Sequence, residues 1–301
     1  MRLLIILLIL NAIPGVASAQ TPTLNSIVKE VVDDFRQHRS HGGYDLHKAF
    51  TRDLKYGNDC CIKATDPPAT MCVAGVAEIV VETLNRYAAS ANDQSPFQKL
   101  PLTSWTRGNL TSIRANIFMY DGTGSRGTGH AFEKLGLGKE KSFSELKPYD
   151  FVNLNRTSGS GHAVVFISFL DANSNETSNY SANVIGFHYF SAQGKGKPDA
   201  GFADRFAYFD GKCPDQPVAG RPRDCGVIRS SNRALLDGGE LWSPTAWTTT
   251  QAISRITTRV RGVLESRFAG QPRGFIDTKL NVELEKELTP NLEQFNGETT
   301  D

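Results

Sequence analysis

Cys72 and His162 are the two residues whose types and settings could carry out chemistry together. Cys72 follows Pro67-Pro68 and opens an apolar segment that is expected to be helical. A helix N-terminus presents unpaired N–H groups and a positive dipole end, and both favour a thiolate over a thiol. A thiolate attacks carbonyl carbon, and the same N–H groups could stabilise the resulting oxyanion. The position alone fits a buried apolar side chain or half of a disulfide equally well.

His162 could supply the base that a cysteine nucleophile needs. It follows the flexible segment Ser158–Gly161 and begins an apolar run that ends at Leu170. In cysteine hydrolases the base is distant in sequence and close in space. A histidine at the start of a strand is more often structural, but together with a cysteine at a helix start it favours a nucleophile–base pair.

A third polar residue should orient the imidazole through its second nitrogen. If residues 161–170 and 184–190 form an antiparallel hairpin, the partner of His162 falls near residue 191. The candidates there are His188, Ser191 and Gln193. We expect Gln193, because its long side chain carries an amide oxygen that can accept from an imidazole N–H.

Hydrophobic periodicity and breaker residues predict the elements that position these side chains. Helices are expected over 24–39, 71–89 (with Thr70 as N-cap), 128–135 and 248–267. Strands are expected over 113–120, 151–154, 161–170 and 184–190, and an irregular, Gly/Pro-rich region over 194–246. The helix at 71–89 is apolar on more than one face, which is typical of a helix buried inside a domain.

The order of these segments resembles the NlpC/P60 and CHAP-type amidases, which are papain-like cysteine enzymes. The resemblance rests on Cys72, then Glu145–Val152 (ELKPYDFV), then Gly161–Ile167 (GHAVVFI), and covers roughly residues 60–210. In those amidases a Pro-Gly-Asp turn introduces the strand that precedes the histidine strand. Here the turn reads Pro-Tyr-Asp, with Tyr149 in the place of the glycine.

The resemblance implies an α+β, papain-like fold with a central nucleophile helix packed on an antiparallel β-sheet. It implies hydrolysis of amide bonds in peptidoglycan stem peptides or cross-links, without a cofactor or metal. Cys72 would be the nucleophile, His162 the general base and acid, and Gln193 the orienting residue. A papain-like protease or an acyltransferase would use the same nucleophile chemistry.

Residues 1–19 have the pattern of a secretory signal peptide. Arg2 is followed by the apolar run Leu3–Ile13 and by the small residues Ala17-Ser18-Ala19. The chain is therefore expected to be exported, to the periplasm or outside the cell, where disulfides persist. Three further parts are expected: an N-terminal helical segment (20–59), a papain-like core (60–212), and a loop region with a C-terminal helix and an acidic tail (213–301).

The chain has five cysteines, so at least one cannot pair within a monomer. Cys213 and Cys225 flank a Pro/Gly-rich loop and could pair with each other. Adjacent cysteines such as Cys60 and Cys61 rarely bridge each other, which leaves the connectivity open. A function of another class, a secreted binding protein stabilised by disulfides, would have Cys72 bridged.

Composition excludes several classes of partner. With 33 Lys+Arg against 32 Asp+Glu, the chain lacks the basic excess that holds proteins to nucleic acid. It has no apolar run of eighteen residues, so no stable membrane insertion is expected. The oligomeric state stays open.

Two further motifs are expected to bind neither a dinucleotide nor a metal. Gly122–Gly127 matches G-x-G-x-x-G, but the helix predicted after it is too short for a dinucleotide-binding unit. His38, His41, Asp45 and His47 match no common zinc spacing.

Overall fold

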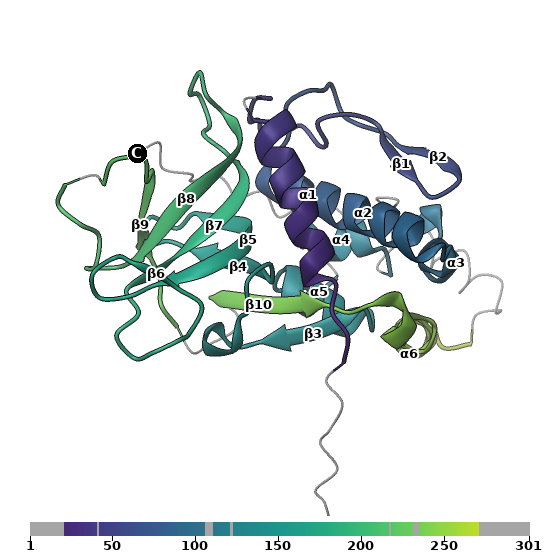
Figure 1. Ribbon diagram of the computed structural model, residues 1–301. Coiled ribbons are helices and arrows are strands. Elements are labelled where there is room, and N and C mark those ends of the chain that lie inside the picture. Colours follow the sequence, from purple (N-terminus) through teal and green to yellow (C-terminus); the bar gives the residue numbers. More distant parts are fainter. Residues whose placement is uncertain are drawn as a thin grey trace, which may run out of the picture.

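The computed structural model describes residues 21–40, 42–105, 111–120, 123–216, 218–230 and 235–270. The expected signal peptide, the acidic tail and His41 lie outside the described residues. The described part is α+β: helices pack on a large, mostly antiparallel sheet (Figure 1).

Helix α2 (Cys72–Ala91) runs through the core, and its burial along most of its length confirms the predicted buried helix. It begins one residue later than expected, with Met71 as N-cap and no side-chain cap. Thr70, the expected N-cap, instead accepts a hydrogen bond from the backbone N–H of Phe50 at 3.0 Å. The helix ends at Asn92, whose left-handed backbone (φ 50°) stops further winding.

The large sheet has the strand order β3-β10-β4-β5-β7-β8-β9, and β6 pairs with β5 beside this path. Neighbouring strands are antiparallel except β8 and β9, which are parallel. The strands are β3 (Gly138–Lys141), β4 (Phe151–Asn155), β5 (Gly161–Leu170), β6 (Glu176–Thr177), β7 (Gly186–Gln193), β8 (Gly201–Phe209), β9 (Arg223–Val227) and β10 (Leu236–Leu241). A separate ribbon pairs β1 (Leu54–Tyr56) with β2 (Asp59–Ile62).

The remaining helices surround this sheet and α2. They are α1 (Asn25–His38), α3 (Ser95–Lys99), α4 (Ile113–Ile117), α5 (Thr128–Lys134) and α6 (Thr249–Arg267). Helix α1 packs on α2 and β8, while α5 packs on β10 and β3 (Figure 1). None of the described helices is both long enough and apolar enough to cross a membrane.

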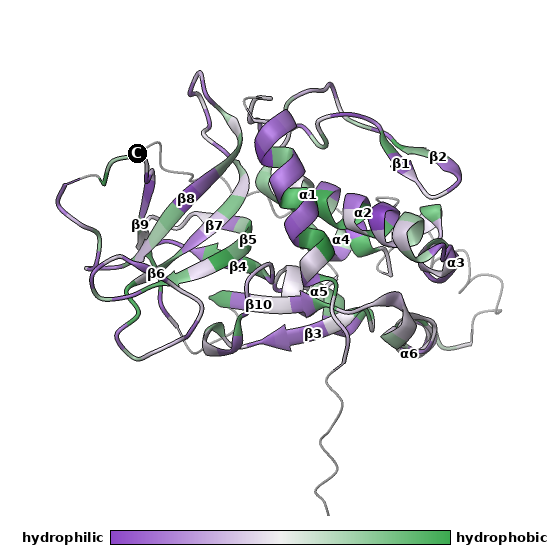
Figure 2. Ribbon diagram, in the orientation of Figure 1, coloured by the Kyte–Doolittle hydropathy of each residue, from purple (hydrophilic) through white to green (hydrophobic). Residues whose placement is uncertain are grey.

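The two faces of the sheet carry separate apolar clusters. Along β5, Ala163 and Val165 belong to the cluster that also contains Cys72 of α2. Val164 and Phe166 belong to a second cluster, with Phe187 of β7. Successive strand residues point to opposite faces, so α2 covers one face of β5 and a different core covers the other. Strand β3, at the edge of the sheet, is hydrophilic by contrast (Figure 2).

Most predicted elements are confirmed, including α1, α5, α6 and the antiparallel pairing of β5 with β7. The strand predicted over 113–120 is wrong, because this segment begins with helix α4. Ser112 caps that helix, its hydroxyl accepting from the Ala115 N–H, and this local cap outweighs the strand-like composition.

The irregular region predicted over 194–246 is also wrong, because it contains β8, β9 and β10. Strand β10 lies inside the sheet, between β3 and β4, although it reads Leu-Asp-Gly-Gly-Glu-Leu. Its Gly238 and Gly239 lie against Gly129 of α5, so closely that a side chain at Gly129 or Gly239 would overlap the other segment. Glycine here allows close approach of two backbones and does not indicate a loop.

The disulfide pairs are Cys60–Cys61 and Cys213–Cys225, which lie at bonding distance. The second pair confirms the expected one. The first joins adjacent cysteines, which rarely bridge each other, so the sequence left this pairing open. Cys60 and Cys61 lie in the small ribbon, whereas Cys225 lies in the large sheet.

Gly75 sets how closely α2 approaches the sheet. A Cβ at this position would lie 3.0 Å from the Phe202 ring and 3.1 Å from Ala192 Cβ. We expect Gly75→Val to lower the free energy of unfolding by about 1–3 kcal/mol through overpacking. Urea denaturation measures this. The same substitution at Gly262 of α6, where nothing lies within 4 Å, should cost nothing; equal losses would contradict the packing argument.

Candidate active site

Cys72 is the first residue of α2 and its side chain is fully buried. It is a free thiol, whereas the other four cysteines form the pairs Cys60–Cys61 and Cys213–Cys225. Among the described residues, no hydrogen-bond partner is found for its sulfur. The chain therefore holds an unpaired thiol at the start of a buried helix, in an apolar setting.

The position of the thiol relative to the sheet follows from Gly75, one helical turn further on. Gly75 faces Ala192 of β7 and Phe202 of β8. Residues three apart share a helix face, so Cys72 lies on the side of α2 that meets the sheet. Its apolar cluster includes Ala163 of β5 as well as Ala192.

His162 is the second residue of β5 and is also buried. Its Nε2 lies 2.7 Å from the Ser191 hydroxyl, and its ring packs edge-on against Tyr189, with centroids 5.7 Å apart. It pairs across the strands with Leu154 of β4, which belongs to the cluster on the face away from α2. The side chain of His162 therefore points away from α2, whereas Cys72 lies on the α2 side of the sheet. The structure does not bring the expected pair together.

Of the three candidates for the orienting residue, Ser191 is the one that contacts His162. Gln193, the expected one, donates from Nε2 to the Ala203 carbonyl at 2.9 Å and accepts from the Ser191 hydroxyl at 3.4 Å. Its long side chain reaches the neighbouring strand β8, while the short serine side chain stops beside the imidazole. The prediction of Gln193 as the direct contact is therefore corrected to Ser191.

His188, the third candidate, belongs to a different group of charges. Its Nδ1 lies 2.8 Å from Glu176 and its Nε2 2.9 Å from Asp204, and its ring stacks on Phe206. Both ring nitrogens are thus bonded to carboxylates. His188 has no contact with His162 among these interactions.

A buried ion pair that the sequence did not reveal completes the surroundings of His162. Arg156 holds Asp224 through two hydrogen bonds of 2.6 and 2.7 Å, and the Tyr189 hydroxyl donates to Asp224 at 2.8 Å. Burial opposes ionisation of Asp224, but the Arg156 charge and these hydrogen bonds prevail and lower the pKa of the carboxyl. Burial and the Asp224 charge raise the pKa of Tyr189. No local motif links residues 156, 189 and 224, so sequence reasoning had no signal for this network.

A second ionisable cluster lies where α5 meets β3 and β10. The carboxyl groups of Glu140 and Asp237 lie close enough to influence each other's ionisation, and Arg126 contacts both oxygens of Glu140 at 3.0 Å. Because the site is buried, two negative charges side by side are unfavourable. The nearby positive charge of Arg126 favours the ionised form of Glu140, so Asp237 is the carboxyl that keeps its proton. The pKa of Glu140 is lowered and that of Asp237 is raised to about 8. The backbone N–H of His130 donates a hydrogen bond to the Asp237 carboxyl at 3.2 Å.

No group of three or more His, Cys, Asp or Glu side chains in the described part of the chain is arranged to hold a metal ion.

Comparisons with known proteins give no match: no family model, no curated protein and no solved structure resembles the chain significantly.

Asp237 makes stability depend on pH. Its pKa is raised in the folded state, so between about pH 4 and pH 8 the folded chain keeps a proton that the unfolded chain releases. Stability should therefore fall as pH rises through this window. Asp237→Asn keeps the acceptor for His130 and offers Glu140 a donor, so it should remove that slope. We expect the variant to gain at least about 1.4 kcal/mol over the parent between the two ends of the window.

Urea denaturation at several pH values measures this gain, with Asp210→Asn, an exposed carboxylate, as the control. A pH slope that survives in Asp237→Asn would contradict the assignment of the proton to this pair.

Proposed function

We propose that this chain is an exported cysteine-dependent amide hydrolase, with Cys72 as nucleophile and His162 as base. The observation that carries the proposal is the free thiol on the first residue of a buried helix, in a chain whose other cysteines are paired. Within the chain, Cys72 has no disulfide partner, whereas the alternative of a disulfide-stabilised binding protein requires Cys72 to be bridged.

The order of elements supports a papain-like arrangement. A helix that starts with the cysteine packs on an antiparallel pair of strands, β5 and β7. Strand β5 carries the histidine near its start, and β7 carries the polar residue bonded to it. Because Nε2 of His162 contacts Ser191, the proton-transfer role falls to Nδ1, and Ser191 becomes the orienting residue.

The turn before β4 also supports the resemblance. The amidases have glycine where this chain has Tyr149, and Tyr149 has a left-handed backbone with φ 72°. A positive φ is the conformation that glycine adopts without cost. Asp150, the last residue of the turn, accepts hydrogen bonds from the Lys147 N–H, from Lys141 and from Asn25, each at 2.8 Å. The turn thus keeps the backbone form of the motif without its glycine.

The positions of the two side chains impose a condition on this mechanism. Cys72 and His162 are buried on opposite faces, so the start of β5 must leave its place beside β4 for the imidazole to reach the thiol. The turn before β5, which would have to move with the strand, contains Gly159 with φ 85° and is closed by a hydrogen bond from the Gly159 N–H to the Arg156 carbonyl at 2.9 Å. The structure then corresponds to a closed, inactive form.

In the open form the Cys72 thiolate would attack the amide carbonyl, giving a tetrahedral oxyanion near the first N–H groups of α2. His162, having taken the thiol proton, would give it to the departing amine. Water would then attack the thioester, lose a proton to His162 and release the acid and the free thiol. The proposed substrates are peptidoglycan stem peptides or cross-links. Cleavage of proteins, or acyl transfer to an amine, would use the same steps.

A secreted binding protein is the second candidate. It is favoured by the burial and the opposite orientation of Cys72 and His162, which in a non-catalytic protein need no movement to explain them.

Digestion of purified peptidoglycan sacculi, followed by mass spectrometry of the soluble products, tests the proposal. The wild-type chain should release fragments with new amine or carboxyl ends, and Cys72→Ala and His162→Gln should each lower the rate by at least ~10³-fold. His162→Gln is chosen because glutamine can still bond to Ser191, which limits the loss of stability. Ser191→Ala should retain partial activity, as an orienting residue does.

His38→Ala, at an exposed histidine, is the control and should retain full activity. Circular dichroism shows whether each variant is folded. A folded His162→Gln variant with wild-type activity would contradict the proposed base, and inactivity of the wild type on sacculi, peptides and acyl acceptors alike would favour the binding protein.

Reaction with a thiol reagent tests the required opening. Denatured, unreduced protein should show one free thiol per chain, mapping to Cys72. Native protein should react far more slowly, because the thiol is fully buried, and its rate reports how often the chain opens. If no thiol is titrated after denaturation, Cys72 is bridged and cannot be the nucleophile.

A further inference from the structure

A cavity of about 510 Å³ lies between α6, α5 and the loop that precedes α5. Its walls are formed by Thr123, Gly124, Arg126, His130, Lys134, Ala252, Arg255 and Ile256. Three of these residues are cationic and none is acidic. The whole chain is almost neutral, with 33 positive and 32 negative side chains, so this cavity concentrates one sign of charge.

The loop side of the cavity is held in place by the fold. Lys134 donates to the carbonyl of Thr123 and, at 3.0 Å, to Asn116. Gly127 has φ 150°, and a side chain there would overlap Asn153 and Asp237, so the loop lies directly on the sheet. The cationic groups of this wall are therefore positioned before any ligand arrives, which lowers the entropic cost of binding.

His130 adds a neutral donor to the same wall. Its Nδ1 accepts from the backbone N–H of Arg126 at 3.1 Å, which places the ring proton on Nε2. Burial and the nearby charge of Arg126 lower the pKa of His130, so the ring stays uncharged near neutral pH. A neutral imidazole can then donate one N–H to a ligand oxygen.

The opposite wall is the face of α6 that carries Arg255. Arg255 is exposed and has no ion-pair partner among the described residues. Arg126, by contrast, is fixed by Glu140, which balances its charge. Ala252 and Ile256 lie on α6 beside Arg255 and give the cavity an apolar portion. The cavity thus has hydrogen-bond donors, both charged and neutral, on part of its wall and an apolar surface at Ala252 and Ile256.

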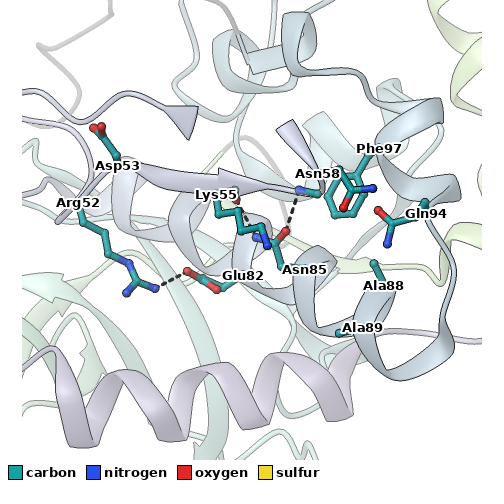
Figure 3. A pocket seen from close by; sticks show the side chains of 11 residues that line it. Arg52, Asp53, Lys55, Asn58, Glu82, Asn85, Ala88, Ala89, Gln94 and Phe97 are labelled. Carbon is teal, nitrogen blue, oxygen red and sulfur yellow. Dashed lines mark hydrogen bonds and ion pairs between the residues drawn. The ribbon is translucent and has the colours of Figure 1, made fainter. Parts of the chain in front are cut away.

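We propose that this cavity binds a small organic oxyanion, a phosphate or carboxylate, through Arg255, Lys134 and His130. Guanidinium and ammonium groups form their strongest hydrogen bonds with these anions. No lining residue comes from α2, β5 or β7, so the proposal does not depend on the hydrolase. It also differs from the groove between the β1–β2 ribbon and α2, whose Arg52 and Glu82 pair with each other and whose Asn85 holds the ribbon backbone (Figure 3).

Isothermal titration calorimetry with the purified chain tests the site, using inorganic phosphate in one arm and N-acetylalanine in the other. At least one probe should bind, more weakly as salt is added. Arg255→Gln should weaken binding roughly tenfold, the loss of one charge-assisted hydrogen bond. Arg255 is exposed, so this variant should fold normally.

Arg267→Gln, at an exposed arginine at the end of the same helix, is the matched control and should bind like the parent. Binding of phosphate alone identifies a phosphoryl ligand, and binding of N-acetylalanine alone identifies a carboxylate. The proposal is overturned if neither probe binds at millimolar concentration, or if both arginine variants weaken binding equally, which would indicate only general charge attraction.

Discussion

The close packing of α2 against β5, β7 and β8 is the constraint on which the rest of the structure depends. Gly75 lets the helix approach Ala192 and Phe202 at a distance that a larger residue would prevent. One turn further along, α2 carries the buried carboxyl of Glu78, which is bonded to Arg39 and to Thr51. Burial raises the pKa of Glu78, and these partners oppose that rise. The N-terminal segment is thereby joined to the same helix that covers the sheet.

Because α2 packs on one face of the sheet, the two faces have different chemical environments. The face toward α2 is apolar and contains the Cys72 thiol. The other face carries an aromatic core and also the polar network of His162, Ser191 and Asp224. A nucleophile and a base on opposite sides of a sheet cannot exchange a proton, so any catalytic use of the pair depends on how readily the start of β5 separates from β4.

A further group of charged side chains lies around β3, at one edge of the sheet, and the neighbouring strand β10. Lys141 bridges Asp150 at 2.8 Å and Glu240 at 2.5 Å, and the Glu140–Asp237 pair lies in the same region. Since unpaired buried charges are costly, each of these carboxyl groups is either protonated or paired with a cation. Asn25, at the start of α1, bonds to Asp150, so this edge also fixes the entry of the N-terminal helix.

The sequence by itself determined the elements with a clear period or cap, such as α1, α2 and β5, and the pairing of β5 with β7. It did not reveal β10, whose glycines are explained only by their contact with α5. It placed Ser191 and Gln193 on one strand face and favoured Gln193 as the contact of His162, which was wrong because the longer Gln193 side chain reaches the neighbouring strand β8.

The orientation of His162 was decided only by the tertiary structure. Strand β5 is apolar at both its odd positions, Ala163 and Val165, and its even positions, Val164 and Phe166. Alternation along the strand therefore places His162 on the same face as Val164 and Phe166, but the local sequence does not indicate which face meets α2. Both faces of β5 are buried, so only the docking of the helix on the odd face separates the histidine from the cysteine.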